Sequence, residues 1–219
     1  MHNAYKGGLY TPAKKTLNYK THWKVKKLWE EYRKMPEVIV ENIVASTSFA
    51  DKLDLDVIAQ SLEEAEYEPE QFPGLVYRLS NPKTATLLFR SGKANCTGAK
   101  NIEDVEKTVA IIAEKLRKLG VDVYKDKDLK IVIQNIVAIS DLGTELNLNE
   151  VAMGLGLENV EYEPEQFPGL VYRIKDPKVA MLLFGSGKIV CTGARKTDDV
   201  SLAVDKLSAE LSSLDLIRK

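Results

Sequence analysis

The same thirteen-residue segment, EYEPEQFPGLVYR, occurs twice in this chain, at 66–78 and at 161–173. A unit of roughly 90 residues that is present twice is too long for a solenoid repeat and indicates a duplicated domain, which normally forms a pseudo-two-fold pair. The segments that match between the two copies are LLFRSGK (87–93) with LLFGSGK (182–188), CTGAK (96–100) with CTGAR (191–195), and, further upstream, ENIVAS (41–46) with QNIVAI (134–139).

Both copies predict the same order of secondary structure. A β-branched strand opens each copy, at 38–46 and at 130–139. A short helix follows, at about 54–65 behind Asp54 and at about 148–156. Four short strands come next, near 66–69, 75–80, 84–90 and 93–98 and at the matching places of the second copy, separated by turn signals such as Pro73-Gly74 and Ser91-Gly92.

A long amphipathic helix closes each copy, at 102–119 and at 198–214, the second with Thr197 as its expected N-cap. Five strands and two helices per copy predict an α+β fold in which helices cover one face of an antiparallel sheet. We expect the two copies, repeat 1 at 37–128 and repeat 2 at 129–219, to join into one ten-stranded sheet.

Residues 1–36 form a basic extension with a net charge of +7, whereas the other 183 residues sum to −8. Apolar residues between Trp23 and Tyr32 are typical of a short basic amphipathic helix, which could contact DNA or a partner protein. A third interpretation is that Met35 is the native start and that the extension does not belong to the native protein. Sequencing the N-terminus of the native protein distinguishes these interpretations.

Composition excludes several classes of protein. No apolar run is long enough to span a bilayer, so we expect no membrane partner. Two cysteines and two histidines, the latter at His2 and His22, provide neither a disulfide framework nor a histidine-based metal or catalytic site in the repeats. We therefore predict no enzyme activity, no catalytic residue, no metal and no cofactor.

Strand alternation predicts which side chains remain on the sheet face that the helices leave free. If Ile43, Leu88 and Cys96 point toward the helices, the other face carries Val44, Leu87, Phe89 and Thr97 with the amide of Asn42. Repeat 2 has the same pattern. Such an apolar face is seldom left bare, so it either binds a ligand or is a second core that a second copy of the chain covers.

These motifs identify a resemblance to the TATA-box-binding protein family, most closely its archaeal members. QNIV, YEPEQFPGLVYR and SGKIVCTGA carry it, together with their first-half partners, over about 38–217. The resemblance implies a saddle-shaped antiparallel sheet with four helices on its convex face. It also implies a general transcription factor that binds A·T-rich promoter DNA in the minor groove and bends it by inserting phenylalanines.

The resemblance implies a set of DNA-binding residues on the concave face. Amide and hydroxyl donors near the pseudo-dyad are Asn42, Thr97, Asn135 and Thr192; the apolar bed is Val44, Leu87, Val137, Leu182 and Val190; the inserted rings are Phe72, Phe89, Phe167 and Phe184; the phosphate contacts are Arg78, Ser91, Lys93, Arg173, Ser186 and Lys188. From the residues alone, Phe72 and Phe167 could equally be ordinary core anchors of their turns.

Repeat 1 departs from the family pattern at one place on this face. Asn95 stands where repeat 2 has the apolar Val190. An amide there could donate to or accept from a base edge, or only cost desolvation, so full symmetry of contact is in doubt.

The resemblance also implies protein partners and a location in the cell. Glu163 and Glu165 match the acidic loop that the family presents to transcription factor B, although a solvated loop carboxylate is the plainer interpretation. Glu68 and Glu70 repeat these residues in the first half, so we expect an asymmetry such as Arg90 against Gly185 to help the partner distinguish the ends. RNA polymerase would follow indirectly, a homodimer could form without DNA, and an archaeal member would be located in the cytoplasm with the nucleoid, a eukaryotic one in the nucleus.

Overall fold

The computed structural model describes residues 36–217, which form one ten-stranded antiparallel sheet with the order β2-β3-β4-β5-β1-β6-β10-β9-β8-β7. The order reads the same from both edges, as a duplicated unit requires. The strands are β1 (Val38–Ser48), β2 (Ala65–Glu66), β3 (Leu75–Ser80), β4 (Lys83–Leu88), β5 (Lys93–Ala99), β6 (Val132–Asp141), β7 (Val160–Glu161), β8 (Gly169–Ile174), β9 (Val179–Phe184) and β10 (Lys188–Ala194).

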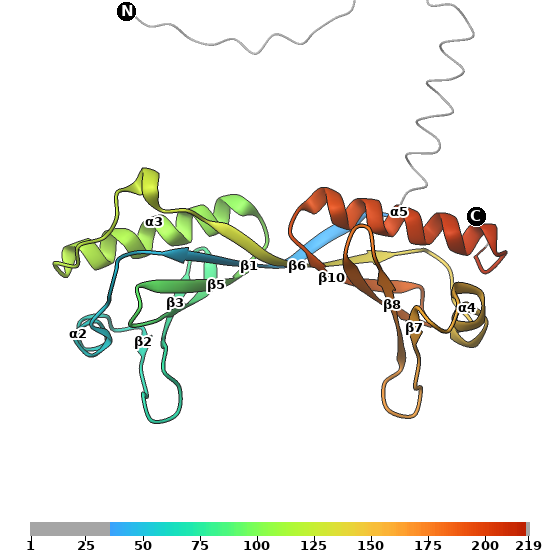
Figure 1. Cartoon of the computed structure of the whole chain (residues 1–219), viewed down its shortest axis with the longest axis horizontal. Helices are drawn as coiled ribbons and strands as arrows, with labels where there is room; N and C mark the ends of the chain where they lie inside the picture. The colour runs from blue at the N-terminus through green and yellow to red at the C-terminus, as the bar shows by residue number, and fades with distance from the viewer. Residues whose placement is uncertain (1–35, 218–219) are drawn as a thin grey trace, which may run out of the picture. The chain divides into compact units, whose positions relative to one another are not determined.

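Four helices lie within the described residues: α2 (Leu55–Ser61), α3 (Ile102–Lys118), α4 (Leu148–Leu155) and α5 (Thr197–Ser213), with one short 3-10 turn at Asp126–Asp128. The long helices α3 and α5 run along the convex side of the curved sheet (Figure 1). The loops after β2 and β7 project from the opposite side. The sheet therefore keeps one face without a helix, as the sequence predicts.

The two repeats join through β1 and β6, which pair antiparallel with Ile43 opposite Ile136. The register shifts once on each side of this pair, because Glu41 in β1 and Gln134 in β6 are each an extra residue. Such bulges bend a strand and increase its twist. They occupy matching places in the two repeats, so the sheet curves to the same extent on both sides of the dyad.

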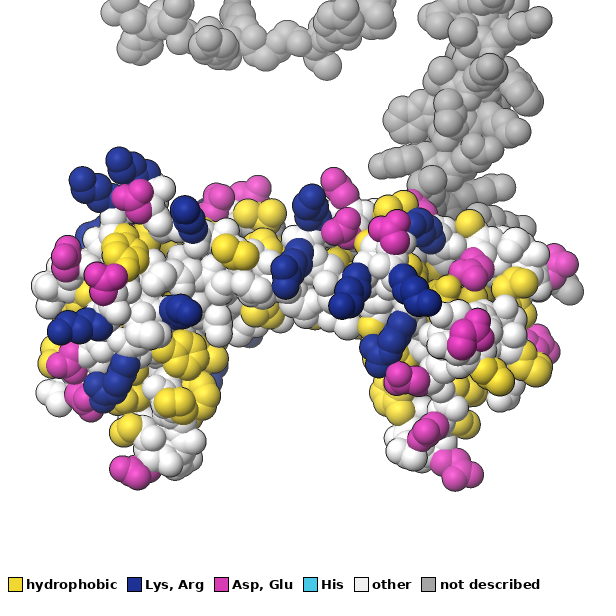
Figure 2. Space-filling view, in the orientation of Figure 1, with side chains coloured by type: hydrophobic (Ala, Val, Ile, Leu, Met, Phe, Trp, Pro, Cys, Tyr) yellow, Lys and Arg dark blue, Asp and Glu magenta, His cyan; other side chains and the backbone are white. Residues whose placement is uncertain are grey.

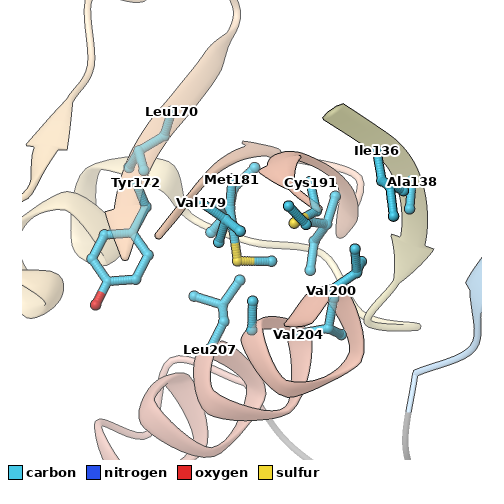
Figure 3. Close-up of a cluster of buried hydrophobic side chains, with 14 of the residues drawn as sticks. Ile136, Ala138, Leu170, Tyr172, Val179, Met181, Cys191, Val200, Val204 and Leu207 are labelled. Atoms are coloured by element: carbon cyan, nitrogen blue, oxygen red, sulfur yellow. The ribbon is translucent and has the colours of Figure 1, made fainter. Parts of the chain in front are cut away.

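The core lies between the sheet and the long helices. In repeat 2, Val200, Val204 and Leu207 of α5 pack on Met181 of β9 and Cys191 of β10 (Figure 3). In repeat 1, α3 buries the apolar stripe that its spacing predicts, including Val105, Val109, Ile112 and Leu116. Burying such side chains contributes about 1.5–3 kcal/mol each, which holds the helices on this face.

Some predicted boundaries are wrong. Thr197 is the first residue of α5 and not its N-cap, which is Lys196 and makes no side-chain capping bond. The strands expected near 66–69 and at the matching place of repeat 2 end at Glu66 and Glu161, because the carbonyl of Glu68 accepts hydrogen bonds from the next loop residues and starts a turn. Asp54, in contrast, caps α2 as expected, by accepting from the Val57 N–H at 3.3 Å.

The residues before Pro36, which include the predicted basic extension, lie outside the described part of the chain. Among residues 36–217, none of the helices combines the length and the hydropathy that a bilayer-spanning segment needs.

Candidate nucleic-acid interface

The free face of the sheet carries the side chains that alternation predicts. Ile43, Leu88 and Cys96 are almost fully buried beneath the helices. Val44, Leu87, Phe89 and Thr97 are half-buried and belong to neither buried cluster. In repeat 2 the free face holds Asn135, Val137, Leu182, Phe184, Val190 and Thr192, all half-buried.

The asparagines nearest the dyad have a fixed orientation. The Asn42 amide oxygen accepts from the Gly98 N–H at 2.7 Å and from the Thr97 hydroxyl at 3.1 Å. The Asn135 amide oxygen accepts from the Gly193 N–H at 2.7 Å in the same way. A backbone N–H can only donate, so the amide oxygen must face it and the NH₂ group must lie on the other side. Asn42 therefore presents its NH₂ group as a donor toward a ligand, and Asn135 presents the N–H that does not donate to the Thr192 hydroxyl at 3.1 Å.

A pair of phenylalanines stands at each end of the free face. Phe72 and Phe89 meet edge to face with ring centroids 6.1 Å apart, and Phe167 and Phe184 do so at 5.9 Å. Phe72 and Phe167 remain 40% and 39% exposed, so they are not core anchors of their turns. Edge-to-face contact contributes about 0.5–1.5 kcal/mol, which holds the exposed rings in place without burying them.

A glycine lies behind each pair of rings. A Cβ added at Gly74 would lie 2.7 Å from Phe72 Cε1 and 3.0 Å from Phe89 Cε1. At Gly169 the corresponding distances to Phe167 and Phe184 are 2.6 and 3.1 Å. Any side chain at these positions would displace both rings. Sequence reasoning treated these glycines only as turn signals, because the contact with the rings depends on the fold.

The predicted phosphate-contacting cations are exposed along the edges of this face. Lys93 and Lys188 begin β5 and β10 and are exposed, and Ser91 and Ser186 are exposed in the turns before them. Arg78 and Arg173 each pair with a carboxylate of the neighbouring edge strand, Glu66 at 3.8 Å and Glu161 at 3.1 Å. Exposed pairs of this kind contribute at most about 1 kcal/mol, so an arriving phosphate can replace the carboxylate.

Two matching hollows flank the asparagines, and they differ in charge. The hollow of repeat 2 has a volume of about 1070 Å³, and Lys and Arg side chains gather on this flank of the molecule (Figure 2). Its charged lining is Arg173, Lys175, Lys178 and Arg195 against Glu158, Glu161 and Asp199. The hollow of repeat 1, of about 810 Å³, has Arg78 and Lys83 against Glu41, Glu63, Glu64 and Glu66. Repeat 2 therefore offers an anion more attraction than repeat 1 does.

The free face includes residues that sequence reasoning missed. Val76 and Val171 are half-buried and lie opposite the predicted Leu87 and Leu182. Ala85 and Ala180 are also half-buried and precede the same leucines by two residues. Strict alternation from Arg78 and Leu87 would have found these four. Ser46 and Ile139 also flank the predicted set, opposite Asn95 and Val190, but the bulges near the dyad obscure the alternation there.

The cysteines lie on the helix side, as predicted. Cys96 is 3% and Cys191 is 1% exposed, and both are free thiols. Burial raises the pKa of Cys96 and raises that of Cys191 to about 11, so both remain protonated and unreactive at neutral pH. No group of three or more potential metal-ligating side chains occurs among the described residues.

The acidic residues of the two projecting loops are exposed. Glu163 and Glu165 lie in the loop between β7 and β8, and Glu68 and Glu70 in the loop between β2 and β3. Arg90 distinguishes the two ends: it contacts Asp56 of α2 at 2.6 Å and lies 5.8 Å from the centre of the Tyr67 ring. Gly185 takes its place in repeat 2, so that loop has no such tie to its short helix.

Taken together, a duplicated sheet with helices on one side and a twinned apolar face with fixed donors and exposed rings define the class of saddle-shaped, internally duplicated α+β proteins. The family model described as "Transcription factor TFIID (or TATA-binding protein, TBP)" matches residues 37–119 and 130–214. The chain belongs to the TATA-binding protein family.

Relatives agree with this assignment. The chain is 61% identical to the TATA-box-binding protein of Picrophilus torridus over 183 residues, which is 84% of this chain and 98% of that protein. It is 62% identical to that of Thermoplasma volcanium over 181 residues, 83% of this chain and 97% of the relative. Its fold resembles the solved structure of Methanococcus jannaschii TBP with a TM-score of 0.74 and 52% identity, covering 81% of this chain and 99% of that one.

Proposed function

We propose that this protein is a general transcription factor that binds A·T-rich TATA-box promoter DNA in the minor groove through the free face of its sheet. Family membership supports this, since its relatives carry the name TATA-box-binding protein. The observation that carries it is the pair of asparagines at the dyad, each held with its NH₂ group outward. The family comprises transcription factors, so the expectation that the chain is not an enzyme is confirmed.

The donors match what an A·T minor groove displays. That groove presents only the acceptors adenine N3 and thymine O2, so a reader of A·T pairs needs donors and no acceptors. The Asn42 and Asn135 oxygens are already occupied by backbone N–H groups, which leaves only their N–H groups for bases. A guanine N2 amino group at this place would find both amide oxygens already engaged by Gly98 and Gly193.

The apolar bed adds to this selection. Val44 and Val137 lie beside the asparagines on the same face, with Leu87 and Leu182 further out. A guanine amino group pressed on these carbons would lose its water and gain no hydrogen bond, which costs about 1–3 kcal/mol. The face therefore selects A·T pairs mainly by what it excludes.

The two phenylalanine pairs would act as wedges that kink the duplex. Phe72 and Phe167 are exposed at the roots of the projecting loops, and Phe89 and Phe184 support them. Unstacking a base step is costly, so a wedge must be rigid before DNA arrives. The glycines behind the rings permit this close packing.

Local charge reconciles DNA binding with an acidic body. Arg78, Arg173, Lys93 and Lys188 surround the free face and would contact phosphates, together with Ser91 and Ser186. Phosphate contacts position a protein on DNA but carry no sequence information. Sequence selection must then come from the face itself.

A gel-shift comparison tests the proposal. A TATA-like duplex should bind, and a duplex in which G·C pairs replace the A·T pairs should bind at least about 100-fold more weakly, since each mismatched pair costs about 1–3 kcal/mol. Equal binding to the two duplexes would instead favour a duplicated protein-interaction or ligand-binding module. A homodimer that forms through the same face without DNA would be detected by analytical sedimentation of the free protein.

We further propose that the second loop recruits transcription factor B, and through it RNA polymerase, in the archaeal cytoplasm with the nucleoid. Glu163 and Glu165 are exposed in this loop, which projects beyond the strands of the free face. Glu165→Ala should spare DNA binding and weaken recruitment of transcription factor B in a supershift assay. Glu70→Ala, the same change in the first loop, is the matched control and should leave recruitment intact.

A further inference from the structure

The two halves of the free face differ in chemistry at one cross-strand pair. In repeat 1, Ser46 of β1 lies opposite Asn95 of β5. In repeat 2, the matching pair is Ile139 of β6 opposite Val190 of β10. The next strand is the same on both sides, because Asn95 pairs with Leu87 and Val190 with Leu182. A polar pair thus replaces an apolar pair within the same surroundings.

The polar pair is accessible. Asn95 is exposed, and its side chain makes no hydrogen bond with any of residues 36–217. Ser46 is half-buried, and its hydroxyl oxygen accepts from the Gln134 amide at 2.7 Å. Ser46 and Asn95 line a hollow of about 460 Å³ together with Phe89 and Lys93. A group that enters the hollow from DNA can therefore reach both an amide and a hydroxyl.

The matching place in repeat 2 has no hydrogen-bonding side chain. Ile139 is 37% exposed and Val190 is half-buried, so both face the ligand side with carbon only. In the minor groove, the guanine N2 amino group is the one feature that distinguishes a G·C pair from an A·T pair. Ile139 and Val190 would leave that donor without a partner, whereas the Asn95 carbonyl oxygen can accept from it.

We infer that Ser46 and Asn95 make repeat 1 tolerant of a G·C pair that repeat 2 rejects, so the protein binds an asymmetric promoter site in one orientation. This inference rests on the proposed function and adds a specificity determinant to it. The Asn95 amide can also donate to adenine N3 or thymine O2, so A·T pairs remain acceptable to repeat 1. The result is tolerance in one half and strict selection in the other.

The charge difference between the two hollows cannot replace this determinant. Repeat 2 has more cations around its hollow than repeat 1 has. Phosphates are the same at both ends of a site, however, and contacts with them do not depend on base sequence. A difference in contact with base edges, in contrast, depends on base sequence and can orient the protein.

The experiment uses the full chain and a palindromic A·T duplex with one G·C pair in one half, at the step that contacts this cross-strand pair. Because Cys96 and Cys191 are buried, a cleavage reagent attached to Glu68→Cys in the exposed first loop reports which half of the DNA repeat 1 occupies. We expect cleavage on the side of the G·C pair to exceed that on the other side by roughly tenfold. Equal cleavage on both sides would overturn the inference.

A duplex with an inosine·cytosine pair in place of G·C is the chemical control. Inosine lacks the N2 amino group, so its minor-groove edge resembles that of an A·T pair. The orientation bias should disappear with inosine. A bias that persists would show that duplex stiffness orients the protein, and it would overturn the role of Asn95.

Two reciprocal variants complete the test. Asn95→Val with Ser46→Ile makes repeat 1 like repeat 2 and should abolish the bias. Val190→Asn with Ile139→Ser should create tolerance in repeat 2 and also reduce the bias to near one, so it tests the inference even if the first variant folds poorly. Each variant is compared with its own affinity for the all-A·T duplex. If wild-type protein fails to bind that duplex, the proposed function fails; if it binds without bias, only the present inference fails.

Discussion

The two repeats have nearly the same free face, whereas their cores differ most clearly at one cluster of polar positions. Where α3 packs on the sheet in repeat 1, three threonines are buried: Thr84 and Thr86 of β4 and Thr108 of α3 itself. At the matching positions, repeat 2 has Val179 and Met181 of β9 and Ala203 of α5. Other core pairs, such as Ile43 with Ile136 and Leu88 with Leu183, are identical, so the free face has stayed as alike as the core although it is not buried. A face that remained alike without being buried is best explained by something that contacts it.

The tyrosines at the helix–sheet boundary show the same divergence. In repeat 1, the Tyr77 hydroxyl donates to Glu64 at 3.2 Å, and the Lys115 ammonium lies 5.4 Å from its ring centre. In repeat 2, Glu210 stands at the position of Lys115 and accepts directly from Tyr172 at 2.9 Å. Both tyrosines therefore donate to a carboxylate, but the long helix supplies a cation to the ring in repeat 1 and the carboxylate itself in repeat 2.

The strongest test of the likeness of the two faces is a pair of variants at the dyad, Asn42→Asp and Asn135→Asp. A carboxylate can still accept from Gly98 or Gly193, so the fold is retained, but it offers no donor and repels the base acceptors. Each variant should lose about 2–3 kcal/mol of affinity for an A·T duplex, or roughly 30- to 150-fold, as measured by gel shift with a thermal-melt control. Losses that differ more than about tenfold between the variants would contradict equal roles.

Removal of the rings should have the next largest effect. Phe184→Ala and Phe89→Ala each remove the support of the exposed ring beside it. We expect a smaller bend, measured by energy transfer between the duplex ends, and a loss of about 1–2 kcal/mol in affinity. Leu202→Ala, an exposed change on α5, is the control. A bend that does not change in Phe184→Ala would rule out the wedge assignment.

The buried threonines of repeat 1 predict two smaller effects, changes of opposite sign in the free energy of unfolding. The Thr86 hydroxyl is buried without a hydrogen-bond partner in the described residues, so Thr86→Val should raise the free energy of unfolding by about 1 kcal/mol. The Thr84 and Thr108 hydroxyls lie 3.0 Å apart, so Thr84→Val should lower it by about 1 kcal/mol. Denaturant unfolding of the two variants measures both changes. Destabilisation by both would mean that the Thr86 hydroxyl is satisfied.

The last expected effect is a dependence of stability on alkaline pH that arises in repeat 2. Burial, together with the bond to Glu210, raises the pKa of the Tyr172 phenol from 10.0 to about 12. Between these values the unfolded chain has lost the proton and the folded chain keeps it, so stability is complete below pH 10 and falls as pH rises toward 12.

Tyr172→Phe should flatten this part of the stability profile, measured by chemical denaturation at several alkaline pH values. Tyr77→Phe removes the matching hydroxyl of repeat 1 and is the control, in which the slope should persist. A slope unchanged in Tyr172→Phe would place its origin elsewhere in the protein.

Much of the fold and the face could be predicted because both depend on short-range periodicity. A strand alternates every second residue, so once Ile43 and Leu88 are assigned to the core, Val44 and Leu87 must lie on the other face. The repeat then supplied an independent check, since Ile136 and Leu183 are buried in the same way.

Contacts between distant segments could not be predicted. The bond from Gly98 to Asn42, the packing of Gly74 behind Phe89, and the bond from Gln134 to Ser46 each join residues that the sequence does not relate. The extra residues Glu41 and Gln134 also interrupt alternation near the dyad. Whether the interface residues bind DNA as expected, and whether Glu163 and Glu165 bind a partner, remain predictions.

The pairing of β1 with β6 has a mechanical consequence. The two halves belong to one continuous sheet, because hydrogen bonds run from strand to strand across the dyad from one edge of the sheet to the other. The sheet therefore has no hinge between the two repeats about which they could rotate, and its curvature is set when the chain folds. In the proposed complex the protein behaves as a stiff template, so the work of deformation falls on the nucleic acid, and flexible base steps are favoured even where no side chain touches them.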